Sequence, residues 1–411
     1  MRRGEVEVRA LPSRGRAKLD AIEGALPDAP SPERVVLLTP AFLALLAVNA
    51  AFSFAFATFF LLPKFLAQEL GASPSAIGAV TSVFAGAMVL AMPVVGRMLD
   101  GTRNRAVLAW GCALMAASAL GFATVDTIGP TIFLLRALQG FSLSMVNNAG
   151  SVMAADLAPP GRLAQSLGLY AGTGMVMTAV APACAELLAE RVGYGMVFTI
   201  ASSAAVVAVW LSLRVRDRGA ASTQPSSMWR LVRTKRSRAL LTVFACAGVG
   251  FGVTFTFSTP FALEVGIANV RGFFLAFAVG ATAMRLGLGG TIDRIGHQRV
   301  ATRALLGYGA CIAAMCLLAP GRLELLGAMI GLAHGLFIPA FMAFAVSSSE
   351  KHEHGKLMTL LNGAFNVGNA SIVLLGIAAE RFGYRAVFAA TGTLVLGASC
   401  ALHAVAKERS P

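Results

Sequence analysis

Two arginines stand inside long apolar stretches of this 411-residue chain. Arg136 lies about eight residues into a stretch that begins near Ile128, and Arg285 lies in a stretch over about 272–292. They are the only full charges deep within such stretches. A charged side chain near the centre of a bilayer costs at least about 2.5–3.5 kcal/mol, so both arginines are predicted to mark a pathway for a substrate or a coupled ion.

The two arginines differ in predicted depth. At a rise of 1.5 Å per residue, Arg136 is predicted roughly 12 Å from one face of an apolar core about 30 Å thick, close to the midplane. Arg285 is predicted roughly 21 Å deep, past the middle. From there its side chain can also extend to the nearer surface or pack against a gate. A substrate or coupling role is favoured for Arg136, and both roles stay open for Arg285.

Polar residues in other apolar stretches form a weaker set of candidates. Any one of them is more often a helix–helix hydrogen bond, worth about 0.6 kcal/mol, than a ligand-binding group. Glu186, near the end of an apolar stretch, is the best acidic candidate for proton coupling, although it also suits a membrane boundary. Phenylalanines within 52–60 and 251–257 either form an apolar wall or pack and face lipid. The predicted cavity-lining set is Asn49, Asn147, Asn148, His334, Asn362, Asn366 and Asn369.

Twelve apolar stretches position these residues. A helix that crosses a bilayer needs about 20 apolar residues. Strands are excluded because an open sheet in lipid leaves backbone groups unpaired and barrel strands alternate polar with apolar residues. The predicted spans are 39–63, 70–96, 106–125, 128–155, 163–185, 192–213, 239–263, 272–292, 304–321, 325–349, 357–379 and 386–406.

The basic residues indicate an orientation. Of the 34 Lys and Arg residues, 26 fall in the tails and the loops of one side, six fall in loops of the other side, and Arg136 and Arg285 make up the rest. Lys64 is among the six. The positive-inside rule predicts that both termini are cytoplasmic. This placement accounts for the net charge of +14 without a nucleic-acid surface.

Composition excludes several classes of protein. Hydrophobic residues make up 56% of the chain and charged residues 13%, whereas a soluble domain has about 25% charged residues. The six cysteines have no metal-site spacing, and no P-loop for ATP is present. The chain is therefore predicted to be no enzyme and to need no metal or cofactor. A membrane sensor remains as an alternative, but it would usually add a soluble output domain, and the tails 1–38 and 407–411 are short.

An internal repeat divides the chain into halves. The nonapeptide ERVGYGMVF at 190–198 returns as ERFGYRAVF at 380–388, and Gln139-Gly140 aligns with His334-Gly335. We predict an all-α membrane protein with twelve transmembrane helices in two pseudo-symmetric six-helix bundles. The bundles cover 39–213 and 239–406, and a cytoplasmic linker over 214–238 joins them. Two such halves imply a substrate site at their interface, near the midplane.

A motif in corresponding loops of the two halves carries a family resemblance. The second copy begins Gly-x-x-x-Asp-Arg-x-Gly and closely matches the loop signature of the major facilitator superfamily, whereas the first copy has glycine where the first basic residue is usual. The chain resembles this superfamily over about 39–406, which implies the fold of two six-helix bundles. In the family the motif latches the cytoplasmic gate. The resemblance assigns that role to Gly96, Asp100, Arg103 and Arg105, and to Gly289, Asp293, Arg294 and Arg299.

A second signature of the superfamily, Arg-x-x-Gln-Gly, appears as Arg136, Gln139 and Gly140. In relatives this arginine is linked to substrate or proton coupling. Several members that carry small anions place an arginine of the eighth span in the central cavity, which implies that Arg285 contacts an anionic substrate. The proline-glycine signature of antiporters is not clearly present in the fifth span.

The resemblance implies a secondary transporter of a bacterial inner membrane. We expect proton-coupled export of a small organic solute by alternating access, as in bacterial efflux permeases and antiporters. The alternative is an importer or exchanger of small organic anions. The expected partners are a small-molecule substrate, protons and the lipid bilayer, with the protein acting as a monomer.

Overall fold

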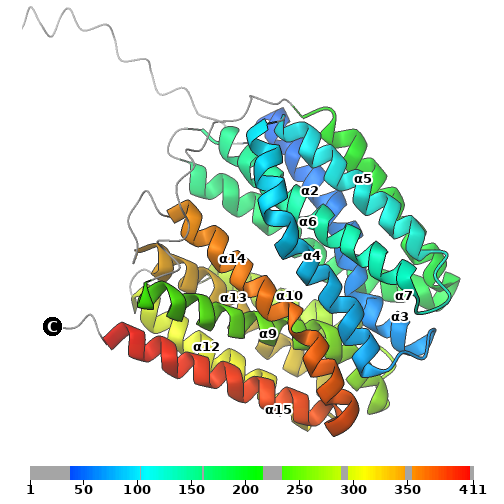
Figure 1. Ribbon diagram of the computed structural model, residues 1–411, viewed down its shortest axis with the longest axis vertical. Helices are drawn as coiled ribbons and strands as arrows, with labels where there is room; N and C mark the ends of the chain where they lie inside the picture. Colours follow the sequence, from blue (N-terminus) through cyan, green and yellow to red (C-terminus); the bar gives the residue numbers. More distant parts are fainter. Residues whose placement is uncertain are drawn as a thin grey trace, which may run out of the picture.

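The computed structural model describes residues 38–101, 103–159, 162–215, 234–287, 295–347 and 354–407, and every element in these ranges is helical (Figure 1). The elements are α2 (Pro40–Thr58), η1 (Phe59–Leu61), α3 (Leu62–Gln68), α4 (Pro74–Gly101), α5 (Asn104–Phe122), α6 (Pro130–Asp156), α7 (Leu163–Ser212), α9 (Lys235–Glu264), α10 (Arg271–Gly287), α12 (His297–Ala314), η2 (Met315–Leu317), α13 (Leu323–Ser347), α14 (His354–Ala370) and α15 (Ile372–Lys407).

Eight helical segments of the described residues are long and apolar enough to cross a membrane. Two of these segments, Gln165–Ser212 and Lys356–Ala404, are 48 and 49 residues long, and each contains a sharp turn at a glycine. A straight helix of 50 residues would be about 75 Å long, more than twice the thickness of an apolar bilayer core. Each of the two long segments is therefore counted as two spans. Together with the other six segments and with α6 and α10, they are consistent with the twelve predicted spans.

Both sharp turns form at a glycine of the repeated nonapeptide. Gly193 in α7 has φ 80° and ψ 165°, and Gly383 in α15 has φ 79° and ψ 162°. This region of backbone space is essentially restricted to glycine, because a Cβ atom would clash with the neighbouring carbonyl groups. The two copies of the repeat therefore make the same turn in the two halves.

Replacing either turn glycine should destabilise the fold. We expect Gly193→Ala and Gly383→Ala each to lower the free energy of unfolding by about 1–3 kcal/mol, because alanine must adopt a strained conformation there. Thermal unfolding of the purified chain in detergent measures the effect. Gly195→Ala is the matched control, since Gly195 has no positive φ and an added Cβ would meet Ala123 O at an ordinary 3.6 Å. An equal loss in the control would contradict this explanation.

The two halves use the same packing scheme. In the first half α6 packs on α4 and α5, and α7 packs on α2 and α5. In the second half α13 packs on α10 and α12, while α15 packs on α12 and α14 packs on α9. Each pair in one half thus has a counterpart in the other, so the fold consists of two pseudo-symmetric helical bundles.

The halves meet through α4 against α14 and α15, and through α7 against α10. Gly78 and Gly376 allow the closest approach: a Cβ on Gly78 would lie 2.8 Å from Ile372 O, and one on Gly376 would lie 2.6 Å from Pro74 O. Nearby, hydrogen bonds from Ser75 hold the pKa of the Glu380 carboxyl below its ordinary value. These contacts lie at the end of the bundle that carries the two glycine turns, which we call the turn end.

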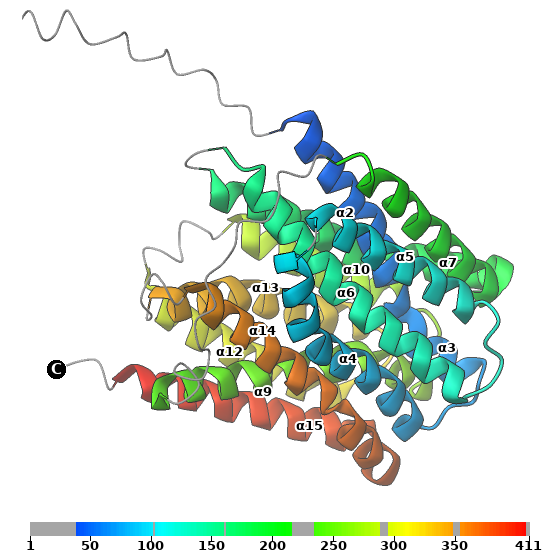
Figure 2. The ribbon, with the colours of Figure 1, turned by 45° about the horizontal axis from the view of Figure 1, so that its top comes forward.

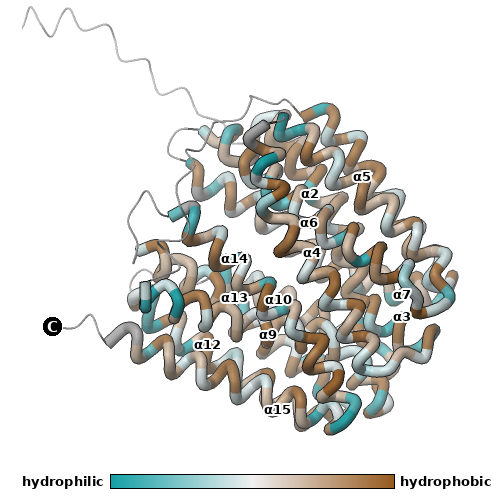
Figure 3. The backbone as a smooth tube through the Cα atoms, in the orientation of Figure 1, coloured by the Kyte–Doolittle hydropathy of each residue, from teal (hydrophilic) through white to brown (hydrophobic). Residues whose placement is uncertain are grey.

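The opposite end, where the described chain begins and finishes, is called the termini end. Figures 1 and 2 show that α4 and α14 lie together near the turn end and diverge toward the termini end. Figure 3 shows hydrophobic residues along the helices and hydrophilic residues mostly near their ends. Large apolar side chains such as Leu90, Val279 and Leu374 are exposed on the outside, as expected for a surface that contacts lipid.

Candidate substrate pathway between the two halves

Arg136 is buried in α6 with few polar partners. Its side chain is 6% exposed, Nη1 donates a hydrogen bond of 2.7 Å to Gln139 Oε1, and the guanidinium lies 4.6 Å from the centre of the Phe84 ring in α4. Arg136 Nε and Gln139 Nε2 are buried without a hydrogen-bond partner. Within the described part of the chain, no carboxylate pairs with this arginine. The spacing of three residues places the two predicted side chains on the same face of the helix, which explains this contact.

A second group of unpartnered polar atoms lies in the other half. His334 of α13 is 6% exposed, and neither ring nitrogen has a hydrogen-bond partner. Its ring is surrounded by those of Phe251, Phe277 and Tyr308, at centroid distances of 5.5, 5.6 and 5.5 Å. Arg285, in the last turn of α10, interacts electrostatically with His334, and its Nε is buried without a partner.

These two groups occupy corresponding positions of the repeat. Gly140, next to Gln139, packs so tightly that a Cβ would lie 2.2 Å from Phe84 O of α4. Gly335, next to His334, would place a Cβ 2.4 Å from Ala281 O of α10. The glycines let α6 approach α4 and let α13 approach α10, so Gln139 and His334 are held at equivalent places in the two bundles.

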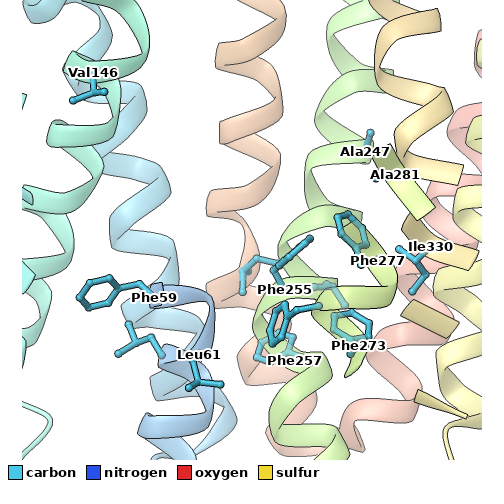
Figure 4. Close-up of a cluster of buried hydrophobic side chains, with 14 of the residues drawn as sticks. Phe59, Leu61, Val146, Ala247, Phe255, Phe257, Phe273, Phe277, Ala281 and Ile330 are labelled. Atoms are coloured by element: carbon cyan, nitrogen blue, oxygen red, sulfur yellow. The ribbon is translucent and has the colours of Figure 1, made fainter. Parts of the chain in front are cut away.

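A row of aromatic rings connects the two groups across the interface. We call it the aromatic path, and it consists of Phe84, Phe56, Phe60, Phe255 and Phe277. Successive ring centroids are 5.6, 5.4, 4.8 and 4.9 Å apart, distances typical of favourable aromatic contacts. The step from Phe60 to Phe255 crosses from one half to the other. Figure 4 shows Phe255 and Phe277 close together in the second half, whereas the ring of Phe59 points away from them, toward the interior of the first half, where it packs on Phe122 and Phe198.

The amino-acid sequence matches a known protein family. The sequence profile of the Major Facilitator Superfamily covers residues 43–326, more than half of the chain. The chain belongs to this superfamily. It is accordingly a transporter and no enzyme, as the sequence predicted.

Curated relatives within the superfamily are multidrug resistance proteins. The chain is 26% identical over 381 residues to "Multidrug resistance protein MdtG" of Citrobacter koseri, which covers 87% of this chain and 92% of that protein. The protein of the same name from Escherichia coli K12 is 26% identical over 281 residues, covering 64% of this chain and 68% of the relative.

Solved structures of superfamily type share the fold. The nucleoside transporter NupG superposes with a TM-score of 0.72 at 14% identity, covering 90% of this chain and all of that one. A bacterial homologue of the human lysosomal transporter Spinster, in an inward-facing and unoccupied conformation, gives a TM-score of 0.74 at 12% identity, covering 89% and 96%. At such identities these similarities establish the fold alone.

The predicted asparagines of this superfamily member have different surroundings. Asn49 Nδ2 donates to Tyr170 O at 2.7 Å, so it links α2 to α7. Asn148 Nδ2 donates to Ser144 O at 2.7 Å, and Asn366 Nδ2 donates to Asn362 O at 2.8 Å, each within its own helix. Asn148 is exposed, whereas Asn366 is buried. Asn49 therefore has a packing role, and a substrate role for any of the three stays a prediction.

The motif predicted to latch a gate lies at the termini end. Gly96 is exposed near the end of α4, and Arg103 is exposed just before α5. Arg105 Nη1 donates to Leu213 O at 3.4 Å, a contact within the first half. Arg299 is exposed on α12. The side chain of Asp100, and Gly289, Asp293 and Arg294 of the second copy, lie outside the described residues, so the gate role stays a prediction.

The sequence interpretation missed one buried charge, Lys64, and its pairing with the candidate Glu186. Lys64, assigned from the sequence to an exposed loop, is only 5% exposed, because the first span continues through η1 and α3 to Gln68. Its Nζ forms an ion pair with Glu186 of α7, which is 1% exposed. The pair lies at the turn end, and Glu186 is therefore placed away from Arg136 and from the centre of the pathway. A signal was present, because a lysine directly after Pro63 interrupts an otherwise apolar helix.

Proposed function

We propose that this superfamily transporter exports a small organic solute by alternating access and that the proton gradient drives the export. The observation that carries the proposal is the aromatic path, which crosses the interface of the halves and reaches the buried Arg136 at one end and the buried His334 at the other. Rings offer an organic solute a large apolar contact surface, and the few polar groups at each end orient it. The likeness to proteins named for multidrug resistance supports export as the direction.

The arrangement of the halves supports alternating access. Contacts between them close the turn end, and α4 and α14 diverge toward the termini end. The positive-inside rule assigns the termini end to the cytoplasm of a bacterial inner membrane. In this assignment the molecule is closed to the outside and binds its solute from the cytoplasmic side. Rocking of the two halves about the aromatic path then exposes the solute to the outside. A monomer contains both halves and suffices for this cycle.

A second candidate function rests on charge. Arg136 and Arg285 each have a buried Nε without a partner, and the ion pairs among the described residues involve neither of them. An organic anion would supply the missing negative charge in a region of low dielectric constant, where charge pairs are strong. Import or exchange of small organic anions is therefore the alternative to export driven by protons.

Transport by the purified full-length chain in proteoliposomes tests both candidates. Radiolabelled salicylate, an aromatic carboxylate, and ethidium, an aromatic cation, serve as probes. We expect an acidic lumen to accelerate accumulation of a probe in inside-out vesicles at least about fivefold relative to vesicles without a gradient, a result that supports proton-driven export. Acceleration by unlabelled salicylate inside the vesicles, and not by the gradient, supports anion exchange. If neither the gradient nor the counter-substrate changes the flux, both candidates are wrong.

A further inference from the structure

The short connection between α9 and α10 is held by charged side chains of the other half. Residues 265–270 form this connection, which we call the 265–270 loop. The ion pair of Lys64 and Glu186 lies directly against it. Both charged residues belong to the first half, whereas the loop belongs to the second, so these contacts join the halves at the turn end.

The hydrogen bonds from the ion pair to the loop go to its backbone. Lys64 Nζ donates a hydrogen bond of 2.7 Å to Ala268 O, in addition to its bond with Glu186 Oε1. Val270 N donates to Glu186 Oε1 at 2.9 Å and to Oε2 at 3.1 Å. The ammonium therefore faces a carbonyl oxygen, and the carboxylate faces an N–H group.

Local structure explains why this N–H group is available. Val270 immediately precedes α10, and Phe273 N donates to Val270 O at 3.0 Å, so Val270 occupies the position before the first helical turn. N–H groups at a helix start have no acceptor within the helix and need another partner. The partial positive charge of the helix start also favours a carboxylate there. Glu186 supplies that partner from the opposite half.

Separation of the halves at the turn end must break these contacts. Hydrogen bonds with an ionised partner are stronger than those between neutral groups, particularly where water is excluded. When the loop moves away, the ion pair stays intact within the first half but loses both backbone partners. These bonds thus exist only while the turn end is closed, and they stabilise the closed state relative to the open one.

We propose that Lys64 and Glu186 form a clamp for the backbone of the 265–270 loop and that this clamp sets the balance between the closed and open states of the turn end. The proposal rests on the alternating access proposed above, because it requires the turn end to open. The two residues act as positioning residues: they hold the loop and hence the start of α10. The hydrogen bonds of the clamp reach the backbone of Ala268 and Val270 and not their side chains.

A nearby ion pair provides an internal comparison. Arg271 Nη1 lies 3.4 Å from Glu190 Oε2, and this contact also joins α10 to α7 across the interface. Its side chains are 37% and 46% exposed, unlike those of the clamp. Exposed ion pairs contribute little because water screens them and the long side chains lose entropy. The clamp should therefore be much more important than this neighbour for closure.

Distances between spin labels test the clamp without any substrate. The labels are attached at Val192→Cys and Phe382→Cys, two exposed positions next to the glycine turns of opposite halves, in the full chain with its six native cysteines replaced. The protein is placed in lipid nanodiscs with no solute and no proton gradient. In the wild-type background we expect mainly the short distance of the closed turn end.

Removing one charge should open the turn end. We expect Lys64→Met and Glu186→Gln each to raise the ratio of long to short distances at least about tenfold, because each change removes a charge-assisted bond and leaves a buried partner unpaired. Val270→Pro, which removes the N–H donor and leaves both charged side chains in place, should act in the same direction. Size-exclusion chromatography of each variant verifies that it is folded. Unchanged distances in all three folded variants would overturn the proposal.

Exchange of the two charges separates the clamp from a simple ion pair. The double variant with Lys64→Glu and Glu186→Lys retains a neutral pair within the first half. It places an ammonium beside the Val270 N–H and a carboxylate beside Ala268 O, so both backbone contacts become repulsive. We expect this double variant to stay open. Return of the wild-type short distance would show that the pair only stabilises the first half and would overturn the clamp.

Matched controls and the choice of readout complete the test. Arg271→Ala should change the ratio of distances by less than about twofold, because it removes only an exposed ion pair. A larger change in this control would contradict the special role assigned to the buried pair. The distances are measured without transport, so the two proposals are tested separately. If the chain transports neither salicylate nor ethidium, the proposed function is wrong. The distances in the variants decide the clamp in either case.

Discussion

Arg285→Ala is expected to abolish transport of an anionic solute while the protein reaches the membrane in wild-type amounts. Arg285 has a buried Nε without a hydrogen bond, and it acts electrostatically on His334, which also has no hydrogen-bond partner. A charge with so few protein partners is retained at a cost. The simplest physical reason for this cost is that a ligand supplies the missing partner during transport.

The expected loss can be estimated from other buried charge pairs. Truncation of one partner of a desolvated, hydrogen-bonded charge pair costs about 2–5 kcal/mol. Since about 1.4 kcal/mol corresponds to a factor of ten, the initial rate of salicylate flux at low concentration should fall about thirtyfold to several thousandfold. The same change removes no contact that the fold needs, so the thermal stability in detergent should not decrease.

Two further variants make this expectation specific. Arg271→Ala makes the same replacement at the other end of the same helix, where the arginine is exposed and paired with Glu190, and it should leave the flux within about twofold of wild type. Arg285→Lys retains a positive charge without the planar guanidinium and should keep part of the activity. Normal salicylate flux in Arg285→Ala would end the anion hypothesis but would leave export of uncharged or cationic solutes standing.

The helices could be predicted well from the sequence because lipid leaves few alternatives. A backbone within the bilayer must satisfy its hydrogen bonds internally, so each apolar stretch of sufficient length becomes a helix. The span predicted at 106–125 is α5, Asn104–Phe122, and the span predicted at 325–349 is α13, Leu323–Ser347. Differences of two or three residues at the ends are ordinary, because charge and capping decide them locally.

The first span shows where this reasoning fails. It was predicted to end at Pro63 because the next residue, Lys64, is charged, yet the helical segment continues to Gln68. The structure pairs Lys64 with Glu186, which lies 122 residues further along the chain. Hydropathy treats each charge separately and has no means to detect a partner so distant. A buried ion pair is therefore invisible to the method that locates the spans.

The candidate site was predicted only in part for a similar reason. Arg136 and Gln139 could be paired from their spacing, because residues three apart lie on one face of a helix. The contact of Phe60 with Phe255 could not, because it joins the two halves and depends on how far they are closed. Asn148 and Asn366 satisfy their amides on their own helices, which the sequence cannot distinguish from cavity-lining roles.

The double variant Arg136→Met with Gln139→Leu is expected to lose transport and to become more stable. In the wild type, Arg136 is buried without a carboxylate partner in the described chain, and its hydrogen bond to Gln139 leaves atoms of both side chains unsatisfied. Apolar residues of similar size remove the cost of burying these groups. Replacements of this kind are often neutral or stabilising by about 1–4 kcal/mol. Transport should fall at least about a hundredfold, because the polar end of the aromatic path is gone.

Ser142→Ala should give the opposite result and so serves as the control. Ser142 lies on the same helix, is fully buried, and donates a hydrogen bond of 2.7 Å to Gly111 O, which links α6 to α5. Its loss should lower the free energy of unfolding by about 0.5–1.5 kcal/mol and leave the flux close to wild type. Thermal unfolding and initial flux, measured on the same preparations, separate the two outcomes. If the Arg136 variant loses stability and activity together, the arginine is a packing residue. A buried charge that serves ligand binding lowers the stability of the fold, whereas a residue that serves packing raises it.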